Sequence, residues 1–318
     1  MNWNPLAGIY GGVVATRNAL YDRGWLRSRR LQGPVISVGN LSTGGSGKTP
    51  FVILLGELLQ ARGIKFDVLS RGYGRATQGV RLVDPGGLAQ DFGDEPLLIA
   101  RRLPVQVVVG EDRFEAGRFA EPQFGAQMHL LDDGFQHRAL ARDFDIVLIT
   151  PDDARDRLLP AGRLREPLSS LQRADAVVLT SGATPESFPV KDKQIWRVRR
   201  GIVTQSSEIP PRPVAFCGIA RPQNFLLQLR AAGIDCVAEA FFRDHHAYTQ
   251  KDVQDLLELK RRSQAGGFVT TEKDAVNLGG YLSALQPLAV IPVKMELADA
   301  DNAVDTMLRV IAERRGRA

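Results

Sequence analysis

The sequence predicts an α/β protein of two domains, each built on a mainly parallel sheet with helices on both faces. Short β-rich runs alternate with helical patterns from residue 34 onward, which is the order that parallel strands joined by crossover helices produce. The alternation pauses between residues 183 and 213 and then resumes, which places a domain boundary near 190–212. A length of 318 residues agrees with about two domains, and a hydrophobic content of 44% is enough for a large core.

Both domains follow this alternation in order along the chain. In the first we expect helices at 49–63 and 93–103, the latter opened by Asp94 as a candidate cap, and strands at 34–40, 65–70, 105–110, 128–133, 145–150 and 176–181. In the second we expect helices at 221–233 and 249–262, and strands at 213–219, 235–242, 266–271 and 287–297. A last helix with basic residues at its C-terminal end closes the chain.

Composition narrows the class of protein. Two cysteines, 19 positions apart, give neither a disulfide framework nor a metal knuckle, so we expect a reducing cytoplasm. A net charge of +5 is mildly basic, which argues against a dedicated nucleic-acid binder and suits an anionic partner such as a nucleotide, a phosphorylated substrate or an acidic membrane surface. For the charge alone, a generic solvated surface is the favoured explanation.

The N-terminal segment, residues 1–30, combines apolar and aromatic residues at roughly helical spacing with a following cluster of arginines. Its uncharged part ends at Thr16, which is too short to span a bilayer and lacks the pattern of a secretory signal. Two interpretations stay open: a helix lying at a membrane interface, or a first helix packed on its own domain.

The stretch "SVGNLSTGGSGKTP" (37–50) predicts a phosphate-binding loop. A strand precedes it and a helix follows, so backbone N–H groups and a helix N-terminus would converge on anionic oxygens. In the usual pattern Lys48 reaches the phosphates and the Thr49 hydroxyl binds Mg²⁺, but Ser42 stands where the first glycine is expected. The candidate nucleotide-binding residues are Ser42, Thr43, Gly44, Gly45, Ser46, Gly47, Lys48 and Thr49.

A second motif, "HLLDDGFQH" (129–137), ends an apolar strand with two carboxylates. Asp132 or Asp133 is a candidate Mg²⁺ ligand beside the loop, and Gln136 and His137 could position water or substrate. Adjacent residues of a strand point to opposite faces, so one of the two aspartates is expected to contact the ion. Taken alone, "DDG" is also ordinary turn chemistry.

The remaining motifs carry less weight by themselves. "FRDHHAY" holds His245 and His246, which are more typical of a structural or surface position and lack metal ligands at suitable spacing. "GRLREP" offers Arg163 and Arg165 to an anion, and "TTEKD" has its lysine one place late for guanine recognition.

Together these motifs resemble the tetraacyldisaccharide 4′-kinase family, the lipid A 4′-kinases of Gram-negative bacteria. "SVGNLSTGGSGKTP", "SRGYGR", "GDEP", "LDDGFQH", "GRLREP", "DHHAY" and "TTEKDAV" occur in the family's order over most of the chain. The family also carries Ser or Thr at the position of Ser42. The resemblance implies transfer of phosphate from ATP, with Mg²⁺, to the 4′-hydroxyl of a tetraacylated disaccharide 1-phosphate.

The resemblance also implies an architecture and a location. It predicts two Rossmann-like α/β/α lobes joined by a two-stranded linker. The first is a P-loop NTPase-type kinase lobe at 31–190, which the last helix (298–318) rejoins, and it follows a membrane-associating helix at 1–30. The linker covers 191–212, and the second lobe, which includes the returning linker strand, covers 213–297. "QIWRVRR" and "PLAVIPVKMEL" are the candidate linker strands. We expect a monomer at the cytoplasmic face of the inner membrane, bound peripherally, with no nucleic-acid partner.

The family's residue roles carry over by motif. Asp94 of "GDEP" would accept the hydroxyl proton, oriented by His245 of the second lobe, which implies that the lobes approach for the pair to form. Lys48 would hold the transferring phosphate, Asp133 joins the catalytic candidates, and Arg165 and Gln136 are weaker candidates for phosphate or substrate contacts. Asn277 departs from the lysine that family members often have.

Two other functions remain open from the sequence. One is a soluble P-loop kinase or ligase acting on a small metabolite, which would not need residues 1–30 for turnover. The other is a nucleotide-binding regulatory protein, which would not need Asp94 or His245.

Overall fold

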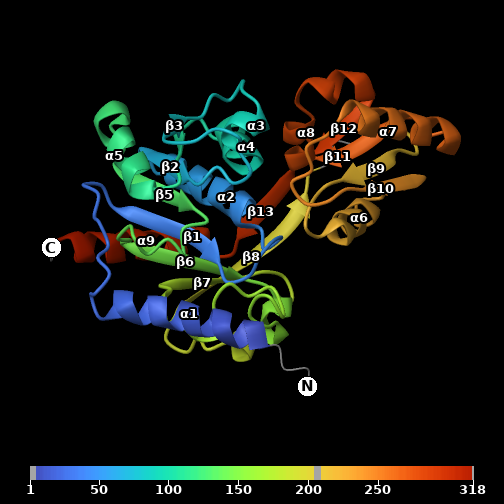
Figure 1. The fold of residues 1–318 in the computed structure, drawn as a ribbon. Helices are drawn as coiled ribbons and strands as arrows, with labels where there is room; N and C mark the ends of the chain where they lie inside the picture. The colour runs from blue at the N-terminus through green and yellow to red at the C-terminus, as the bar shows by residue number, and fades with distance from the viewer. Residues whose placement is uncertain (1–4, 204–208, 317–318) are drawn as a thin grey trace.

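A nine-stranded sheet forms the frame of the larger part of the molecule in the computed structural model, which describes residues 5–203 and 209–316 (Figure 1). Seven neighbouring strands, from β8 to β4, are parallel, and an antiparallel strand lies at each edge. In spatial order the strands are β13 (Val293–Leu297), β8 (Gln194–Ile202), β7 (Ala176–Leu179), β6 (Phe144–Ile149), β1 (Val35–Asn40), β5 (Met128–Asp132), β2 (Phe66–Ser70), β4 (Val107–Val109) and β3 (Arg81–Leu82).

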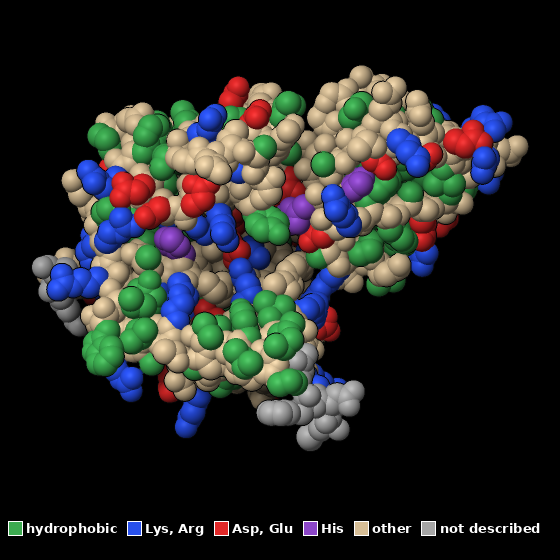
Figure 2. Space-filling model, viewed as in Figure 1, with side chains coloured by type: hydrophobic (Ala, Val, Ile, Leu, Met, Phe, Trp, Pro, Cys, Tyr) green, Lys and Arg blue, Asp and Glu red, His purple; other side chains and the backbone are tan. Residues whose placement is uncertain are grey.

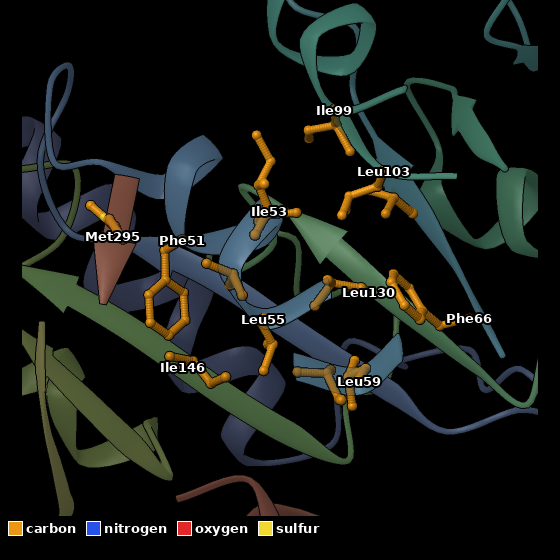
Figure 3. Packing of buried hydrophobic residues seen from close by; sticks show 14 of the residues in the cluster. Phe51, Ile53, Leu55, Leu59, Phe66, Ile99, Leu103, Leu130, Ile146 and Met295 are labelled. Atoms are coloured by element: carbon orange, nitrogen blue, oxygen red, sulfur yellow. The ribbon is translucent and has the colours of Figure 1, made fainter. Parts of the chain in front are cut away.

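Helices cover both faces of this sheet because its central strands are buried on both sides. On one face α2 (Lys48–Ala61), α4 (Asp94–Arg102) and α9 (Ala300–Gly316) close the main core, part of which Figure 3 shows around Phe51, Leu55 and Leu130. On the other face α5 (Arg113–Phe124) packs on β2 and β4, while the segment between β6 and β8 covers the remaining strands. The short helix α3 (Ala89–Phe92) leads into α4.

A smaller parallel sheet forms the second unit, to the right in Figure 1. Its strands lie in the order β10 (Ala238–Phe241), β9 (Val214–Cys217), β11 (Phe268–Thr271) and β12 (Leu288–Ile291). Three helices pack against them, α6 (Pro222–Ala231), α7 (Gln250–Ser263) and α8 (Glu272–Leu278). The mixed α/β class with a mostly parallel main sheet, as predicted, is confirmed.

The strands β8 and β13 run side by side from the large sheet toward the second unit (Figure 1). The prediction of one strand over 287–297 is wrong: residues 288–291 pair within the second sheet, and only Val293–Leu297 pairs with β8. Pro292 separates the two strands, because it has no N–H to donate to a ladder. The domain limits stay a prediction, and residues 1–4, 204–208 and 317–318 within them lie outside the described residues.

Besides the one-turn helix α3, two longer helices were not predicted from the sequence. One is α5, which contains Pro122 and Gly117, both typical of helix breaks. The other is α8, which follows β11 without a loop because Thr271 caps it, its side chain accepting from the backbone N–H of Asp274. The N-terminal segment forms α1 (Pro5–Asp22), which lies along the lower side of the large sheet in Figure 1.

Candidate active site

The glycine loop, residues 41–47, connects the buried end of β1 to the start of α2. This is the carboxyl edge of the parallel sheet, where β1 lies between β5 and β6 and where α/β proteins place their ligands. Gly47, the residue before the helix, has a φ of 87°, which an L side chain rarely adopts. The Asn40 side chain donates to the Ser46 hydroxyl at 2.7 Å and so ties the two ends of the loop.

Residues 163–165 brace this loop from outside. The Thr43 N–H donates to the Arg163 carbonyl at 2.8 Å, and the Arg165 N–H donates to the Leu41 carbonyl at 2.6 Å. Ser42 lies inside this pairing, fully buried, and its hydroxyl has no hydrogen-bond partner among the described residues. The absence of the first glycine therefore leaves the turn intact, because a small side chain fits there.

Asp132 and Asp133 end β5 beside the loop in two different environments. Asp133 leaves the strand with a φ of 52° and turns to the loop, where both Arg165 Nη atoms donate to its carboxylate at 2.8 and 2.9 Å. The Lys48 Nζ lies 3.7 Å from the same carboxylate. Asp132 is buried, accepts from the Ser70 hydroxyl at 3.1 Å and keeps its other oxygen, Oδ1, without a partner among the described residues.

These environments shift the pKa values of the two carboxyl groups in opposite directions. Burial, joined by the like charges of Glu95 and Asp133, raises the pKa of Asp132 to about 7. Burial also acts to raise the pKa of Asp133, but the charges of Lys48 and Arg165 outweigh it and hold that pKa well below its usual range. Asp133 is thus a permanent anion that orients the two cations, whereas Asp132 forms no ion pair with the described residues and feels only the more distant charge of Lys48.

Asp94 and His245 are in contact across the two units. His245 Nδ1 lies 3.0 and 2.9 Å from the two carboxylate oxygens of Asp94, which is 5% exposed. The prediction that Asp94 caps α4 is wrong: Gly93 is the N-cap and Asp94 is the first helical residue. The approach of the two units expected from the sequence is already present in this structure.

The helix α8 of the second unit completes the surroundings of Asp94. Asn277 Nδ2 donates to Asp94 Oδ2 at 3.1 Å, and Lys273 Nζ lies 3.7 Å from the same oxygen. Both residues lie on one face of α8 because they are four positions apart. The position at which the chain departs from the family's lysine is therefore a direct partner of Asp94.

The contact between Asp94 and His245 shifts the pKa values of both groups. Burial acts to raise the pKa of Asp94, but the hydrogen bond from His245 and the charge of Lys273 outweigh it, so that this pKa is lowered. Burial acts to lower the pKa of His245, but the contact with Asp94 outweighs it, so that this pKa is raised. Asp94 is thus ionised, the form that accepts a proton.

The other predicted side chains lie around this site with different roles. Gln136 Nε2 donates to the Asn40 carbonyl at 2.9 Å, and its Oε1 is buried without a partner among the described residues. His246 points away from Asp94 and pairs with Asp252 at 3.1 Å. Arg163 Nε lies 2.8 Å from an Asp156 carboxylate oxygen. This pair stabilises the segment next to the glycine loop, and the Arg163 charge is therefore already balanced.

Sequence reasoning missed Arg113, whose charge acts on Asp132, Asp133 and the predicted residue His137. Arg113 is buried, and neither its Nε nor the Nε2 of His137 has a partner among the described residues. Burial and the charge of Arg113 lower the pKa of His137 to about 4, so it is neutral. No motif marks Arg113, whereas Lys273 and Asn277 were recognisable from their four-residue spacing in "TTEKDAVN".

This arrangement fits one kind of chemistry. A glycine loop at a helix N-terminus can hold phosphates, the neighbouring carboxylate can meet a cation, and an ionised carboxylate held by a histidine can take a proton from a hydroxyl. Fold and site thus define an α/β phosphotransferase with a hydroxyl acceptor.

Comparison with known proteins identifies the family. Residues 2–312 match the family model LpxK, described as tetraacyldisaccharide-1-P 4′-kinase, so the chain belongs to this family. A tetraacyldisaccharide 4′-kinase of Koribacter versatilis is 51% identical over 98% of this chain and 100% of its own length, and one of Chlorobaculum parvum is 41% identical over 85% and 82%. The predicted family and kinase activity are confirmed.

A solved structure shows the same fold. The crystal structure of LpxK from Aquifex aeolicus, titled the "apo" form in complex with ATP, superposes with a TM-score of 0.80 at 34% sequence identity. The match covers 96% of this chain and 98% of that one.

Proposed function

We propose that this site transfers the terminal phosphoryl group of ATP, held by residues 42–49, to the 4′-hydroxyl of a tetraacyldisaccharide 1-phosphate, with Asp94 as the proton acceptor. The observation that carries the proposal is the 2.9 Å contact between Asp94 and His245 across the two units. Because Asp94 and His245 belong to the same chain, one copy is enough to form the pair, and we propose a monomer as the active form. The ATP complex of the A. aeolicus structure supports the choice of nucleotide.

The glycine loop is the proposed nucleotide site. Its backbone N–H groups and the positive end of α2 attract the phosphates, and Lys48 adds a full charge. Lys48 is 12% exposed and already oriented by Asn40 Oδ1 at 3.3 Å and by Asp133. Preorganised charges of this kind stabilise the transferring group without reorganisation during the reaction.

Mg²⁺ fits the residues beside the loop. Asp132 Oδ1 is a buried carboxylate oxygen without a partner among the described residues, and Thr49 is the second residue of α2, directly after the loop. Carboxylate, hydroxyl and phosphate oxygens are the ligands that Mg²⁺ prefers. We propose Thr49 and Asp132 as its protein ligands, since Asp133 is already held by Arg165 and Lys48. When bound, the ion would neutralise charge on the phosphates.

Asp94 is the proposed general base. As the 4′-oxygen forms its bond to phosphorus and the bond to the ADP oxygen breaks, the hydroxyl proton passes to the Asp94 carboxylate. His245 and Asn277 hold that carboxylate in place, and Lys273 keeps it ionised. General-base help of this kind is worth about 10²–10⁴-fold.

The sugar and its 1-phosphate would lie along the unpartnered polar groups of the site. Gln136 Oε1, Arg165 Nε, Arg113 Nε and His137 Nε2 are all buried without partners among the described residues. Unsatisfied buried groups of this kind are costly unless a ligand pairs with them. They suit a substrate that carries hydroxyl groups and an anion.

Peripheral membrane binding is the proposed role of α1. Leu6, Ile9 and Val13 are 60 to 64% exposed and form part of the apolar band that covers α1 in Figure 2. Beside it lies a groove of about 520 Å³ lined by residues that include Ile9, Val13 and Leu26. Apolar side chains next to arginines suit the surface of an anionic bilayer. No described helix is long and apolar enough to cross one.

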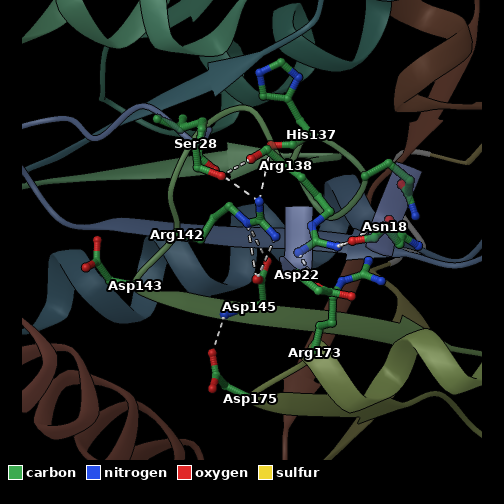
Figure 4. A network of polar contacts seen from close by, with 12 residues as sticks. Asn18, Asp22, Ser28, His137, Arg138, Arg142, Asp143, Asp145, Arg173 and Asp175 are labelled. Atoms are coloured by element: carbon green, nitrogen blue, oxygen red, sulfur yellow. Dashed lines mark hydrogen bonds and ion pairs between the residues drawn. The ribbon is translucent and has the colours of Figure 1, made fainter. Parts of the chain in front are cut away.

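The inner side of α1 is joined to the site. The Tyr10 hydroxyl donates to the Arg165 carbonyl at 3.0 Å, and Arg17 donates to the Gln136 carbonyl at 3.0 Å. Figure 4 shows Arg138, next to His137, reaching Asn18 and Asp22 of this helix. A lipid held at α1 would therefore have its headgroup next to the site, at what we propose is the cytoplasmic face of the inner membrane.

The test is a phosphate-transfer assay with labelled ATP and Mg²⁺, offered either tetraacyldisaccharide 1-phosphate in detergent micelles or a panel of small sugar and nucleoside acceptors. We expect label in the lipid alone, and its loss in Lys48→Ala and Asp94→Ala. Transfer to a soluble acceptor but not to the lipid would replace this function with that of a small-metabolite kinase.

A further inference from the structure

The second unit covers the glycine loop at a place outside the Asp94–His245 contact. Ala220 and Arg221 precede α6 and lie against Gly44 and Gly45. A Cβ built on Gly45 would lie 3.1 to 3.3 Å from Cγ, Cδ and Nε of Arg221, and one built on Gly44 would lie 3.1 Å from the Cβ of Ala220. The Arg221 side chain therefore crosses the loop that would carry the nucleotide phosphates.

A second arginine approaches from the paired strands between the units. Arg200 on β8 is directly opposite Met295 on β13, so both side chains lie on the same face of the pair. Met295 Cε reaches within 2.5 Å of the position that a Cβ on Gly47 would take, which directs this face toward the loop. Figure 2 shows Lys and Arg side chains gathered in the hollow between the two units.

The charges of these two arginines are poorly balanced within the protein. Arg200 Nε is buried and has no hydrogen-bond partner among the described residues. Burial, and then the like charge of Arg221, lower the pKa of Arg200. Arg221 has a carboxylate partner in Asp152 at 3.2 Å, but the Asp152 side chain is 60% exposed and so is a well-solvated, weak partner.

Two cations of the first unit, Arg165 and Lys48, by contrast already have a carboxylate partner in Asp133. Arg165 holds Asp133 at 2.8 Å, and Lys48 lies 3.7 Å from it. A nucleotide triphosphate brings several negative charges to this loop, and two neighbouring guanidinium groups without full counter-charges are stabilised by an anion between them.

We propose that Arg221, supported by Arg200, is a nucleotide-binding residue that the second unit contributes to the phosphates of ATP, exchanging Asp152 for a phosphate oxygen when the nucleotide binds. The inference rests on the proposed use of ATP by the glycine loop. It assigns the second unit two tasks at the site: His245 orients the base, and Arg221 holds the phosphate donor. Bound nucleotide then bridges the two units.

The competing explanation is that Arg221 only forms a structural ion pair with Asp152 that holds the second unit against the first. The two explanations predict different effects of Asp152→Asn on nucleotide affinity. If Arg221 binds phosphate, Asp152→Asn leaves nucleotide affinity unchanged or tightens it, because a competing carboxylate is removed. If Arg221 only forms the structural ion pair, Asp152→Asn and Arg221→Ala weaken nucleotide affinity by the same factor.

The experiment is calorimetric titration of the full chain with ADP and with ATP in the presence of Mg²⁺. We expect Arg221→Ala to raise the Kd about 10- to 100-fold, the usual loss for a hydrogen-bonded charge pair. Arg221→Lys should recover part of this loss, and Arg200→Met should lose less than Arg221→Ala. Arg230→Ala, on the helix that Arg221 precedes but paired with Glu239 on the surface, is the matched control and should bind as the wild type does.

Unchanged affinity in Arg221→Ala, or equal losses in Arg221→Ala and Asp152→Asn, would overturn the proposal. Failure of the wild type to bind either nucleotide would instead reject the proposed function on which it rests. Thermal unfolding of each variant without nucleotide separates a binding loss from misfolding, and Arg221→Lys tests the proposal with the charge retained.

Discussion

Replacing both members of the Asp94–His245 pair should cost no more than replacing one. Asp94→Asn removes the proton acceptor while keeping its size, and His245→Gln removes the group 2.9 Å from it. General-base catalysis contributes about 10²–10⁴-fold, which corresponds to about 3–5 kcal/mol of transition-state stabilisation. Residues that act as one unit show non-additive losses. We therefore expect each single variant to lose about 10²–10⁴-fold in kcat, and the double variant to stay within a few-fold of the worse single one.

The assay is initial-rate phosphate transfer to the lipid acceptor at saturating ATP, together with the Kd for ATP of each variant. Nucleotide affinity should change little, since neither residue belongs to the glycine loop. His246→Gln is the matched control: it adjoins His245 but contacts Asp252 at 3.1 Å, and kcat should stay within about twofold. Multiplicative losses in the double variant would show two independent roles, and an unchanged kcat in both single variants would remove the pair from the mechanism.

The geometry of the site and of α1 leads to four further predictions. Because the pKa of Asp132 is raised to about 7, protons should compete with Mg²⁺ below that pH, and the apparent Mg²⁺ affinity should fall by up to about tenfold per pH unit in activity titrations. Since its folded pKa lies above the unfolded value of 3.8, stability is lost as pH rises from about 4 to about 7, and the loss is complete at pH 8. Asp132→Asn should therefore raise the Tm at pH 8 by a few degrees while reducing turnover; an unchanged Tm would contradict this. Asn277→Leu should lower kcat about tenfold without changing the KM for ATP, because it removes the 3.1 Å hydrogen bond to Asp94; a change confined to KM would contradict it. Ile9→Ser with Val13→Ser should reduce sedimentation with anionic vesicles while leaving ATP binding intact, and unchanged sedimentation would argue against an interfacial α1.

The strands, the glycine loop and the order of the motifs could be predicted from local patterns. Buried parallel strands are short apolar runs, and a loop rich in glycine before a helix has a sequence signature. The misplaced features depend on distant parts of the chain. The break at Pro292 separates two strands that belong to different sheets, and α5 forms despite Pro122 because it packs on β2 and β4.

The sequence predicts which residues belong to the site better than it predicts which of them contact one another. Asp94 has the position of a helix cap in sequence, and only the fold brings α8 and His245 of the second unit to its carboxylate. Asp132 and Asp133 are adjacent and identical in sequence, but the turn at Asp133 with a φ of 52° sends one to Lys48 and Arg165 and leaves the other buried. Arg113 and Arg221 have no motif, since their roles arise from what surrounds them.

The most direct measurement of the central claim is the position of the transferred phosphate. Wild-type protein should convert tetraacyldisaccharide 1-phosphate into a product whose new phosphate lies on the 4′-oxygen by ³¹P–¹H correlation, and a 4′-deoxy analogue should accept none. Labelled phosphate appearing on the existing 1-phosphate, or full transfer to the 4′-deoxy analogue, would contradict the account of Asp94 as the base for the 4′-hydroxyl.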